Sequence, residues 1–535
     1  MTLTYPNVPL HELMQRVARR SPDRVALRFK DRTMTFGEFD EQSNRLANGL
    51  ARLGLSAGDR IGIFVPNCFE FQVCFYAASK LGAVACPLNS AYKEREVVYQ
   101  LNDAGASLLL THISLWPIVE AARSKLPLLR SIVVIGGAPG GGRRVAPPPR
   151  NDGVASATIA FEELCDREHA DPPSVTVSPE WLLCLPYSSG TTGLPKGVML
   201  THRNLVANHI QFGSAGALDS TDVLLVYVPM AHIYGVALMG VAMWSGAQQI
   251  LMERFDLPTV VDLIERHGVT WLHVVPPVLL ALASSPDIDP ARFRSLKFIL
   301  NAAAPLVPDV ARRVERRLSV NVIQAYGLTE ASPDTHHSPL QPDKIRLESV
   351  GVPVPDTEHM VVDSETGEGP LPAGAVGEII VRGPQVMQGY WNAPECTASA
   401  LRDGWLYTGD IGWIDSDGYT FIVDRKKEMI KYKSFSIAPA ELEAIVMQHP
   451  DVADCAVVGA ADAEVGEVPK AFVVARAGGA LDIETLSRFV AERVAGYKQV
   501  RRWEVVSSIP RTPSGKILRR MLKETTVDPD AKRNA

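Results

Sequence analysis

The densest group of hydroxyl, glycine and lysine residues lies in the stretch YSSGTTGLPKGVMLT, residues 187–201. Apolar runs at 182–186 and 198–200 flank a tip that comprises Ser188, Ser189, Gly190, Thr191 and Thr192. Glycines allow backbone N–H groups to converge on an anion without interference from a Cβ atom. Lys196 adds a positive charge beside them. The stretch therefore predicts a hairpin loop that binds a polyphosphate.

Two better-known motifs do not fit this stretch. A Walker loop requires glycine at the fifth position after Gly190, where this chain has Pro195. A nucleophile elbow requires glycine two residues before the serine, and Pro186 stands there before Ser188. The alternative that composition leaves open is a surface turn rich in Ser, Thr and Gly.

A second chemistry-bearing stretch is QAYGLTE, residues 324–330, which follows a strand-like run at 320–323. It places an aromatic ring, a hydroxyl and a carboxylate at the carboxyl end of a predicted strand, in Tyr326, Thr329 and Glu330. Open α/β sheets bind ligands at that end. Mg²⁺ prefers carboxylate and phosphate oxygens as ligands, so Glu330 is a candidate metal ligand.

The elements that must position these residues follow from the apolar pattern. Helical periodicity covers 34–53 and 69–81, and Thr201 can cap a further helix that starts near Asn204. Strand-like runs occur at 61–65, 83–87, 107–110, 132–135, 224–229 and 298–306. This alternation predicts an α/β fold with mostly parallel sheets and helices on both faces.

Length and charge restrict the class of protein. A chain of 535 residues exceeds what one hydrophobic core usually organises, so we expect two or more domains. A formal net charge of -6 offers no strongly basic surface, so no nucleic-acid partner is expected. The chain has neither a long uninterrupted apolar run nor a leader-like start. We expect a cytoplasmic protein without stable membrane insertion, and a homodimer stays open.

The run YSSGTTGLPKGVMLTH resembles the signature of the adenylate-forming superfamily, which includes acyl-CoA synthetases and 4-coumarate-CoA ligases. Motifs at 324–330, 403–412 and 511–520 extend the resemblance from Thr35 to about Arg520. It implies a large N-terminal AMP-binding domain, residues 1–423, and a small mobile α+β lid, residues 424–535. The implied reaction joins a carboxylic acid to ATP with Mg²⁺ and transfers the acyl group to coenzyme A.

The resemblance also implies roles for single residues. Lys516, His232, Thr329 and Glu330 would be catalytic, and Glu330 would hold Mg²⁺. Contacts to ATP or AMP would come from Ser188, Ser189, Gly190, Thr191, Thr192, Lys196, Ala303, Gln324, Ala325, Tyr326, Thr329, Asp410, Arg425 and Lys516. Coenzyme A or the interdomain hinge would involve Arg254, Lys427, Lys431, Lys433 and Ser434.

The acid pocket is the least determined part of this interpretation. The resemblance implies a lining of His232, Tyr234, Ala303, Ala325, Pro333 and Asp334. Relatives usually have an apolar residue at the position of Asp334. Either its carboxylate turns away and bonds to His336, His337 or a backbone amide, or the substrate brings a distal donor or positive charge. We expect the first, with a fatty or aryl acid as substrate.

Other functions stay open at this stage. The acyl-adenylate could pass to a carrier protein or be oxidised, as luciferase does, and the substrate could be a polar or cationic acid. A nucleotide-binding protein without chemistry is disfavoured by Lys516, Thr329 and Glu330. Ser434 stands where relatives usually have glycine, and a Cβ atom there could narrow the path of the thiol.

Overall fold

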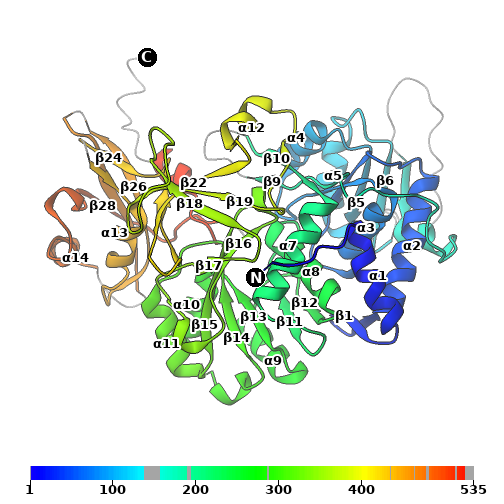
Figure 1. Cartoon of the computed structure of the whole chain (residues 1–535), viewed down its shortest axis with the longest axis horizontal. Coiled ribbons are helices and arrows are strands. Elements are labelled where there is room, and N and C mark those ends of the chain that lie inside the picture. Colours follow the sequence, from blue (N-terminus) through cyan, green and yellow to red (C-terminus); the bar gives the residue numbers. More distant parts are fainter. Residues whose placement is uncertain are drawn as a thin grey trace.

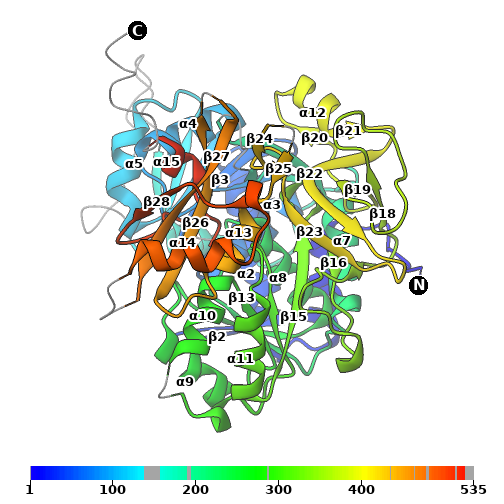
Figure 2. The same ribbon diagram turned by 90° about the vertical axis from the view of Figure 1, so that its left-hand side faces the viewer.

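The computed structural model describes residues 2–137, 157–188, 194–285, 288–433, 435–462, 464–476, 481–512 and 515–524. A large N-terminal part contains three sheets and their helices, and a small C-terminal domain lies at one side of it (Figure 1). Figure 2 turns this small domain toward the viewer. The predicted α/β class, with a large N-terminal domain and a small α+β C-terminal domain, is confirmed.

The first sheet carries the carboxyl ends of several strands to one edge. Its spatial order is β17 (Val352–Pro353), β16 (Asp334–His337), β15 (Asn321–Gly327), β14 (Phe298–Asn301), β13 (Trp271–Val274), β11 (Val223–Val226), β12 (Gln248–Leu251), β1 (Val25–Phe29) and β2 (Arg32–Thr35). The strands from β1 to β15 in this order run parallel, and β16 returns antiparallel to β15. Residues that follow β11, β13 and β14 therefore gather at the edge where such sheets bind ligands.

The second sheet positions the hydroxyl-rich hairpin. Its order is β20 (Gly389–Tyr390), β10 (Lys196–Thr201), β8 (Leu182–Cys184), β4 (Val84–Pro87), β3 (Arg60–Phe64), β5 (Leu108–His112), β6 (Ser131–Ile135) and β7 (Ala157–Ala160), and β9 (Tyr187–Ser188) pairs with β10. The strands β4, β3, β5, β6 and β7 pair in parallel, whereas β10 is antiparallel to its neighbours. The hairpin thus starts from a rigid edge.

Helices fill the space between these two sheets. In α3 (Phe69–Leu81) every residue is buried, as expected for a helix covered on all sides. Its Gln72 amide donates to Gln249 on β12 of the first sheet at 2.9 Å. α2 (Phe36–Arg52) begins at a capping box formed by Thr35 and Glu38. The other helices of this layer are α1 (Leu10–Arg20), α7 (His202–Ala215) and α8 (Ile233–Ser245) (Figure 1).

The remaining helices cover the outer faces of the sheets. α4 (Glu94–Ala104) and α5 (Trp116–Arg123) belong to the second sheet, and α9 (Leu257–His267), α10 (Pro276–Ser284) and α11 (Pro308–Leu318) to the first. α6 (Phe161–Asp166) packs instead against α2, on the inner side of the second sheet. A third sheet consists of β18 (Glu358–Val362), β19 (Gly377–Arg382), β22 (Trp405–Ile414) and β21 (Leu401–Arg402), with β23 (Thr420–Arg425) paired to β22 and α12 (Pro394–Ala400) beside it. This third sheet is antiparallel throughout. The prediction of mostly parallel sheets therefore holds only for the first two.

The C-terminal domain has its own core and its own sheet. The order is β25 (Phe435–Ile437), β24 (Ile430–Tyr432), β27 (Gly466–Ala475) and β26 (Val452–Asp462), with β28 (Arg502–Val505) parallel to β27. α13 (Pro439–Val446) and α14 (Ile483–Ala491) pack on this sheet, and α15 (Arg519–Glu524) follows the last motif. A separate core is what a body able to move as a unit requires.

Two predicted boundaries differ from the observed ones. α7 starts at His202, two residues before the predicted start near Asn204, because the Thr201 side chain accepts the Asn204 N–H group and caps the helix there. β15 continues to Gly327, so Gln324, Ala325 and Tyr326 lie within the strand rather than after it. β16 pairs with this extension and keeps it in the sheet.

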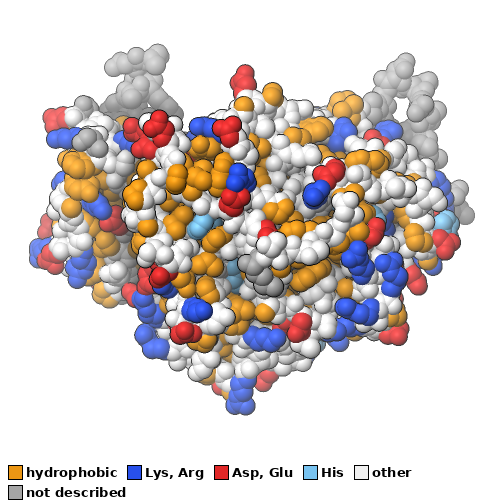
Figure 3. All heavy atoms as spheres, in the orientation of Figure 1, with side chains coloured by type: hydrophobic (Ala, Val, Ile, Leu, Met, Phe, Trp, Pro, Cys, Tyr) orange, Lys and Arg blue, Asp and Glu red, His pale blue; other side chains and the backbone are white. Residues whose placement is uncertain are grey.

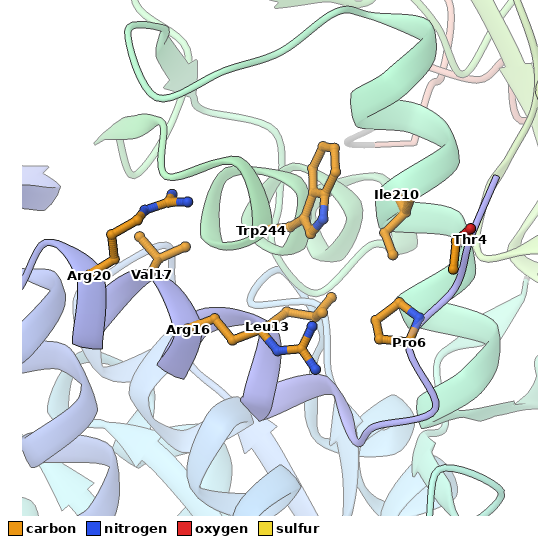
Figure 4. A pocket seen from close by; sticks show the side chains of 8 residues that line it. All are labelled: Thr4, Pro6, Leu13, Arg16, Val17, Arg20, Ile210 and Trp244. Carbon is orange, nitrogen blue, oxygen red and sulfur yellow. The ribbon is translucent and has the colours of Figure 1, made fainter.

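On the face shown in Figure 3, Lys and Arg side chains are interspersed with Asp and Glu side chains. In the described part of the chain, no helix is both long and apolar enough to cross a bilayer. A surface hollow of about 420 Å³ lies beside α1, α7 and α8 (Figure 4), lined by Thr4, Pro6, Leu13, Arg16, Val17, Arg20, Ile210 and Trp244. None of the predicted site residues lines this hollow.

Candidate active site

The loop that carries Lys516 lies against the N-terminal domain. The Lys516 N–H group donates to Thr512 Oγ1 at 3.1 Å, and the Thr512 N–H group donates to the Lys516 carbonyl at 2.8 Å. Gly515 has a φ of 83°, and a Cβ atom added there would lie 3.3 Å from Pro277 Cδ in α10. Glycine therefore allows this loop to adopt a left-handed turn close to the carboxyl end of β13.

The Lys516 ammonium group interacts with charges from several motifs. Burial lowers the pKa of Lys516, the Arg425 charge lowers this pKa further, and Asp410 and Glu330 raise it. In turn, burial and then the Lys516 charge lower the pKa of His232 to about 3. Residues from four distant parts of the chain are thus close enough to act on one another electrostatically.

Asp410 and Arg425 are direct cross-strand partners on β22 and β23. Arg425 Nε donates to Asp410 Oδ1 at 2.7 Å, and the Tyr326 hydroxyl donates to Asp410 Oδ2. Burial raises the pKa of Asp410, and the neighbouring Arg425 opposes this shift. The sheet therefore fixes a buried carboxylate beside an aromatic ring, where its remaining lone pairs can accept hydrogen bonds from sugar hydroxyls.

Glu330 lies with Thr329 in a short 3-10 turn, η3 (Thr329–Ala331), directly after the end of β15. The Tyr390 hydroxyl donates to Glu330 Oε1 at 2.8 Å. Lys196 Nζ lies 5.6 Å from the centroid of the Tyr390 ring. Tyr390 therefore connects the base of the hairpin with the predicted metal ligand.

The base of the hairpin is held by α4. Ser188 on β9 is the register partner of Lys196 on β10. The Tyr187 hydroxyl donates to Asp103 at 2.6 Å, and the Tyr99 hydroxyl donates to the Pro195 carbonyl at 2.8 Å. The predicted phosphate contacts Ser189, Gly190, Thr191 and Thr192 lie outside the described residues.

The predicted adenine wall combines the ends of β14 and β15. Ala303 follows β14 with a φ of 72°, a conformation that alanine rarely adopts. Tyr326 and Ala325 are half-buried on β15, and the His336 ring lies 5.6 Å from the Tyr326 ring. Ala325 and Tyr326 therefore lie on β15, and Ala303 follows the adjacent parallel strand β14, at the ligand-binding edge.

The side-chain amide of Gln324, a predicted ATP contact, is engaged within the protein. Its side-chain amide donates to the carbonyl oxygens of Leu347 and Ser349 at 2.7 and 2.9 Å. The residue is buried, with 6% of its surface exposed. This amide braces the loop after β16 in the described structure.

Tyr234 is buried in the first turn of α8, and His232, the N-cap residue of that helix, is half-buried. His232 Nδ1 accepts the Tyr234 N–H group at 3.2 Å and caps the helix. With its pKa lowered to about 3 by burial, the imidazole is neutral at neutral pH. The Tyr234 hydroxyl lies 3.0 Å from Nδ1 of His273 on β13. His273 was not among the predicted site residues.

The hydrogen bond that we expected Asp334 to make with His336, His337 or a backbone amide is not formed by its Oδ2 atom. Its Oδ2 atom is buried and has no hydrogen-bond partner among the described residues, and the residue is 4% exposed. The backbone is held instead, because Asn208 on α7 donates to the Asp334 carbonyl and accepts its N–H group. Burial raises the pKa of Asp334 well above its ordinary value. The carboxyl is also close enough to raise the pKa of Tyr234. Pro333, the preceding pocket candidate, is half-buried.

The residues predicted for coenzyme A or the hinge lie at the surface. Arg254 is exposed after β12, and Lys427 is exposed after β23. Lys431 Nζ donates to Ser436 Oγ at 2.9 Å, and Lys433 has a φ of 51° at the turn between β24 and β25. Ser434 lies outside the described residues.

Two further residues near the site escaped the sequence argument. Tyr390 follows the run RGPQVMQG at 382–389, which indicates only a turn-rich segment. Glu428 raises the pKa of Lys516 and pairs with Arg519 at 2.6 Å. Both lie far along the chain from the residues they contact, and no local pattern marks them.

The fold and this site define a two-domain α/β protein in which a small domain presents a lysine to acidic and aromatic groups of a large one. The family model described as AMP-binding enzyme matches residues 14–391, and that of the AMP-binding enzyme C-terminal domain matches residues 441–516. The chain belongs to the AMP-binding enzyme family, within the adenylate-forming superfamily that its motifs resemble. It is an acid–thiol ligase of that family.

Curated relatives are similar over nearly the whole chain. A 4-coumarate–CoA ligase of Pinus taeda is 39% identical over 530 residues, which cover 97% of this chain and 95% of the relative. 4-Coumarate–CoA ligase 1 of Solanum tuberosum is 38% identical over 503 residues, which cover 92% of this chain and 89% of the relative.

Solved structures agree with this assignment. The anthranilate CoA ligase AuaEII in complex with anthranoyl-AMP has a TM-score of 0.88 at 27% identity, covering 97% of this chain and 98% of that one. ATP-bound MatB from Rhodopseudomonas palustris has a TM-score of 0.87 at 28% identity, covering 97% of this chain and 99% of that one. Apo MatB gives a lower TM-score of 0.75 with the same identity and coverage. The described structure is therefore more similar to the ATP-bound form of that protein.

Proposed function

We propose that this chain is an AMP-forming ligase that joins an aryl carboxylic acid to coenzyme A through an acyl-adenylate. The observation that carries the proposal is the position of Lys516, which the C-terminal domain brings near Asp410, Glu330 and Arg425. Similarity to 4-coumarate–CoA ligases over at least nine-tenths of the chain supports an aryl acid rather than a fatty acid.

The first half-reaction brings two anions together, so the catalyst must mainly neutralise charge and hold an in-line geometry. In our proposal Asp410 and Arg425 bind the ribose, and Tyr326 stacks on the adenine that lies against Ala303 and Ala325. The Lys516 ammonium group then bridges the acid carboxylate and the α-phosphate. Attack of a carboxylate oxygen on the α-phosphorus releases pyrophosphate and leaves the acyl-adenylate.

Glu330 is the proposed protein ligand for the magnesium ion that accompanies ATP. Within the described residues, no group of three or more His, Cys, Asp or Glu side chains is arranged to hold a metal ion. One carboxylate together with substrate phosphate oxygens is a common arrangement for Mg²⁺. The ion would neutralise charge on the departing pyrophosphate. The Tyr390 hydroxyl orients the Glu330 carboxylate through their 2.8 Å hydrogen bond.

We further propose that the C-terminal domain, predicted to begin at residue 424, rotates from Lys427 onward for the second half-reaction, because β23 keeps Asp424 and Arg425 in the third sheet. β23 reaches Arg425, so the exposed Lys427 follows directly after the last strand of the third sheet and suits a hinge. The rotation would withdraw Lys516 and bring the β24–β25 turn, with Lys431 and Lys433, to the acyl-adenylate. Arg254 is a candidate contact for the phosphates of coenzyme A.

The neutral imidazole of His232 suits a role after the adenylate has formed and before the thiol of coenzyme A enters. Because its pKa is lowered to about 3, it does not add a second positive charge beside Lys516. Its place at the start of α8, where the Lys516 charge acts on it and its Nδ1 atom accepts the Tyr234 N–H group, supports a role in closing the carboxylate end of the acid pocket until the thiol arrives.

The test is coenzyme-A-dependent release of AMP with a panel of acids. The panel should pair aryl acids, such as 4-coumarate and 2-aminobenzoate, with saturated acids of six to sixteen carbons. We expect thioester formation with one or more aryl acids at a higher kcat/KM than with any saturated acid. Activity confined to saturated acids would overturn the aryl assignment, and AMP release that is independent of coenzyme A would overturn the ligase assignment.

A further inference from the structure

The carboxylate of Asp424 bonds to a helix that lies on the other side of the proposed hinge. Asp424 is on β23 and is the register partner of Ile411 on β22, so it belongs to the third sheet. Its Oδ2 atom accepts the N–H group of Ala440, in the first turn of α13, at 2.8 Å. The residue is buried, with 7% of its surface exposed. The bond therefore joins the N-terminal part of the chain to the C-terminal domain.

This bond supplies a cap that α13 lacks in its own sequence. The N-cap residue is Ala438, whose side chain cannot accept a hydrogen bond, and Pro439 follows it at the first helical position. The first N–H groups of a helix have no partner within the helix, and a carboxylate beside them also interacts favourably with the helix dipole. Asp424 thus makes the hydrogen bond that a Ser, Thr, Asp or Asn side chain at the N-cap usually makes.

The hinge separates the two partners of this bond. Lys426 Nζ pairs with Glu378 of the third sheet at 2.7 Å, so the chain is held to that sheet up to Lys426. β24, which follows shortly afterwards, belongs to the sheet of the C-terminal domain. A rotation from Lys427 onward therefore leaves Asp424 in place and carries Ala440 away from it.

α13 is connected in turn to the loop that carries Lys516. Arg519 lies three residues after Lys516, and its Nη2 atom donates to Glu443 on α13 at 2.6 Å. Its Nη1 atom donates to Glu428, directly after the hinge, at 2.6 Å. Burial raises the pKa of Asp424, and the Arg519 charge opposes this shift. A continuous set of contacts thus leads from the third sheet through α13 to the motif of Lys516.

We propose that Asp424 is a positioning residue for the adenylate-forming half-reaction, because its cap on α13 favours the domain orientation that presents Lys516. The inference rests on the proposed function, since it needs a C-terminal domain that rotates between the half-reactions. It adds that the bond between Asp424 and Ala440 exists in only one of the two orientations. The Asp424 carboxylate acts through the equilibrium between the orientations and touches no reacting atom.

The ratio of the two half-reaction rates reports on this equilibrium. Each half-reaction proceeds in one orientation only, so its rate is proportional to the population of that orientation when rotation is faster than chemistry. The ratio of the rates then changes by the same factor as the equilibrium constant, whichever orientation predominates. Damage to the fold that is common to both orientations lowers both rates together and leaves the ratio unchanged.

The experiment removes each partner of the bond in turn. ATP–pyrophosphate exchange with an aryl acid measures the first half-reaction, and thioester formation from a supplied aryl-adenylate and coenzyme A measures the second. Asp424→Ala removes the acceptor, and Ala440→Pro removes the donor without altering the N-terminal domain. α10 begins with Pro276 and Pro277, so two consecutive prolines are compatible with a helix start in this protein. We expect each variant to lower the ratio of exchange rate to thioester rate by about fivefold, as is typical for loss of an N-cap.

The matched control is Asp482→Ala. Asp482 caps α14 of the same domain by accepting the Glu484 N–H group at 3.0 Å, and this bond does not cross the hinge. This variant should keep the ratio. Urea unfolding of all three variants shows how much each cap contributes to the stability of the fold.

Three outcomes would overturn the inference. The first is an unchanged ratio in both Asp424→Ala and Ala440→Pro, and the second is an equal change in Asp482→Ala. The third is a change in only one of the two hinge variants, which would assign the effect to the Arg425 N–H group that Asp424 Oδ1 accepts at 2.7 Å, or to the proline itself. If no aryl acid supports exchange in the natural protein, the proposed function itself fails, so the two failures are distinguishable.

Discussion

The two ends of the proposed acid site differ in how their polar groups are satisfied. At the nucleotide end, Asp410 pairs with Arg425 at 2.7 Å, and Glu330 accepts from Tyr390 at 2.8 Å. At the far end, Asp334 and His337 are buried and partly unpartnered, and burial raises the pKa of Asp334 and lowers that of His337 to about 4. The charged groups of one end are paired, whereas burial at the other end disfavours the charged forms.

This difference matches what each end has to do. Charge develops and moves where ATP reacts, and fixed charges there stabilise the transition state without reorganisation. No charge moves at the far end, so ions would only add a desolvation cost. The contrast predicts separable effects of mutations at the two ends.

The largest expected effect is at the nucleotide end. Lys516→Ala should slow adenylate formation by about 100-fold or more, because the bridging positive charge is lost. A supplied acyl-adenylate should still react with coenzyme A, since that half-reaction does not need the bridge. Pyrophosphate exchange and thioester formation measure the two halves separately. Lys498→Ala, which removes another lysine of the C-terminal domain, paired with Glu441, is the control. Equal losses of rate in both half-reactions would contradict a C-terminal domain that rotates and withdraws Lys516 before the second one.

A smaller effect should separate the two carboxylates of that end. Asp410→Asn should raise the KM for ATP by about tenfold. The substitution removes the negative charge that pairs with Arg425 and weakens the acceptor proposed for the ribose hydroxyls. Glu330→Gln should instead raise the Mg²⁺ concentration needed for half-maximal rate. Titrations of ATP and of Mg²⁺ on each variant check this, with the exposed Glu358→Gln as control. If the two variants behave alike, the division of roles is wrong.

Much of the nucleotide end could be predicted from the sequence, because its polar residues are grouped in short motifs beside apolar runs that are typical of strands. The bounds of α3 match the predicted 69–81, and Thr201 caps α7 as expected. What could not be predicted depends on tertiary pairing. Tyr390 reaches Glu330 only because β20 adds to the edge of β10.

The far end of the acid site was even harder to predict from the sequence. The direction of the Asp334 side chain depends on the irregular register of β15 and β16 between Tyr326 and Gly327. It also depends on the two hydrogen bonds between the Asn208 side chain and the Asp334 backbone. Neither feature leaves a local signal in the sequence. His273 and His337 each look like ordinary strand residues, and only the packing of Phe212 between their rings relates them.

The contrast between the two ends should also appear in stability. Asp334→Leu, nearly isosteric, removes an unpartnered buried carboxyl and should raise the free energy of unfolding by about 1–2 kcal/mol at pH 7.5. Asp410→Leu leaves Arg425 without its partner and should lower it. Urea unfolding without substrates measures both. A loss of stability in Asp334→Leu would mean that the carboxyl already has a partner in the protein.

The smallest expected effect concerns protons at the far end. Burial holds the pKa of His337 at about 4, while the unfolded chain has the ordinary value near 6.5. Between these values the unfolded state binds a proton that the folded state does not, so the free energy of unfolding falls as the pH falls from 6.5 toward 4. His337→Met removes this term and should recover about 1 kcal/mol of the loss between pH 6.5 and 5.5. His202→Gln should flatten the slope similarly, because burial also lowers the pKa of His202, to about 3. A slope that is unchanged in His337→Met would show that this imidazole is not held neutral in the folded protein.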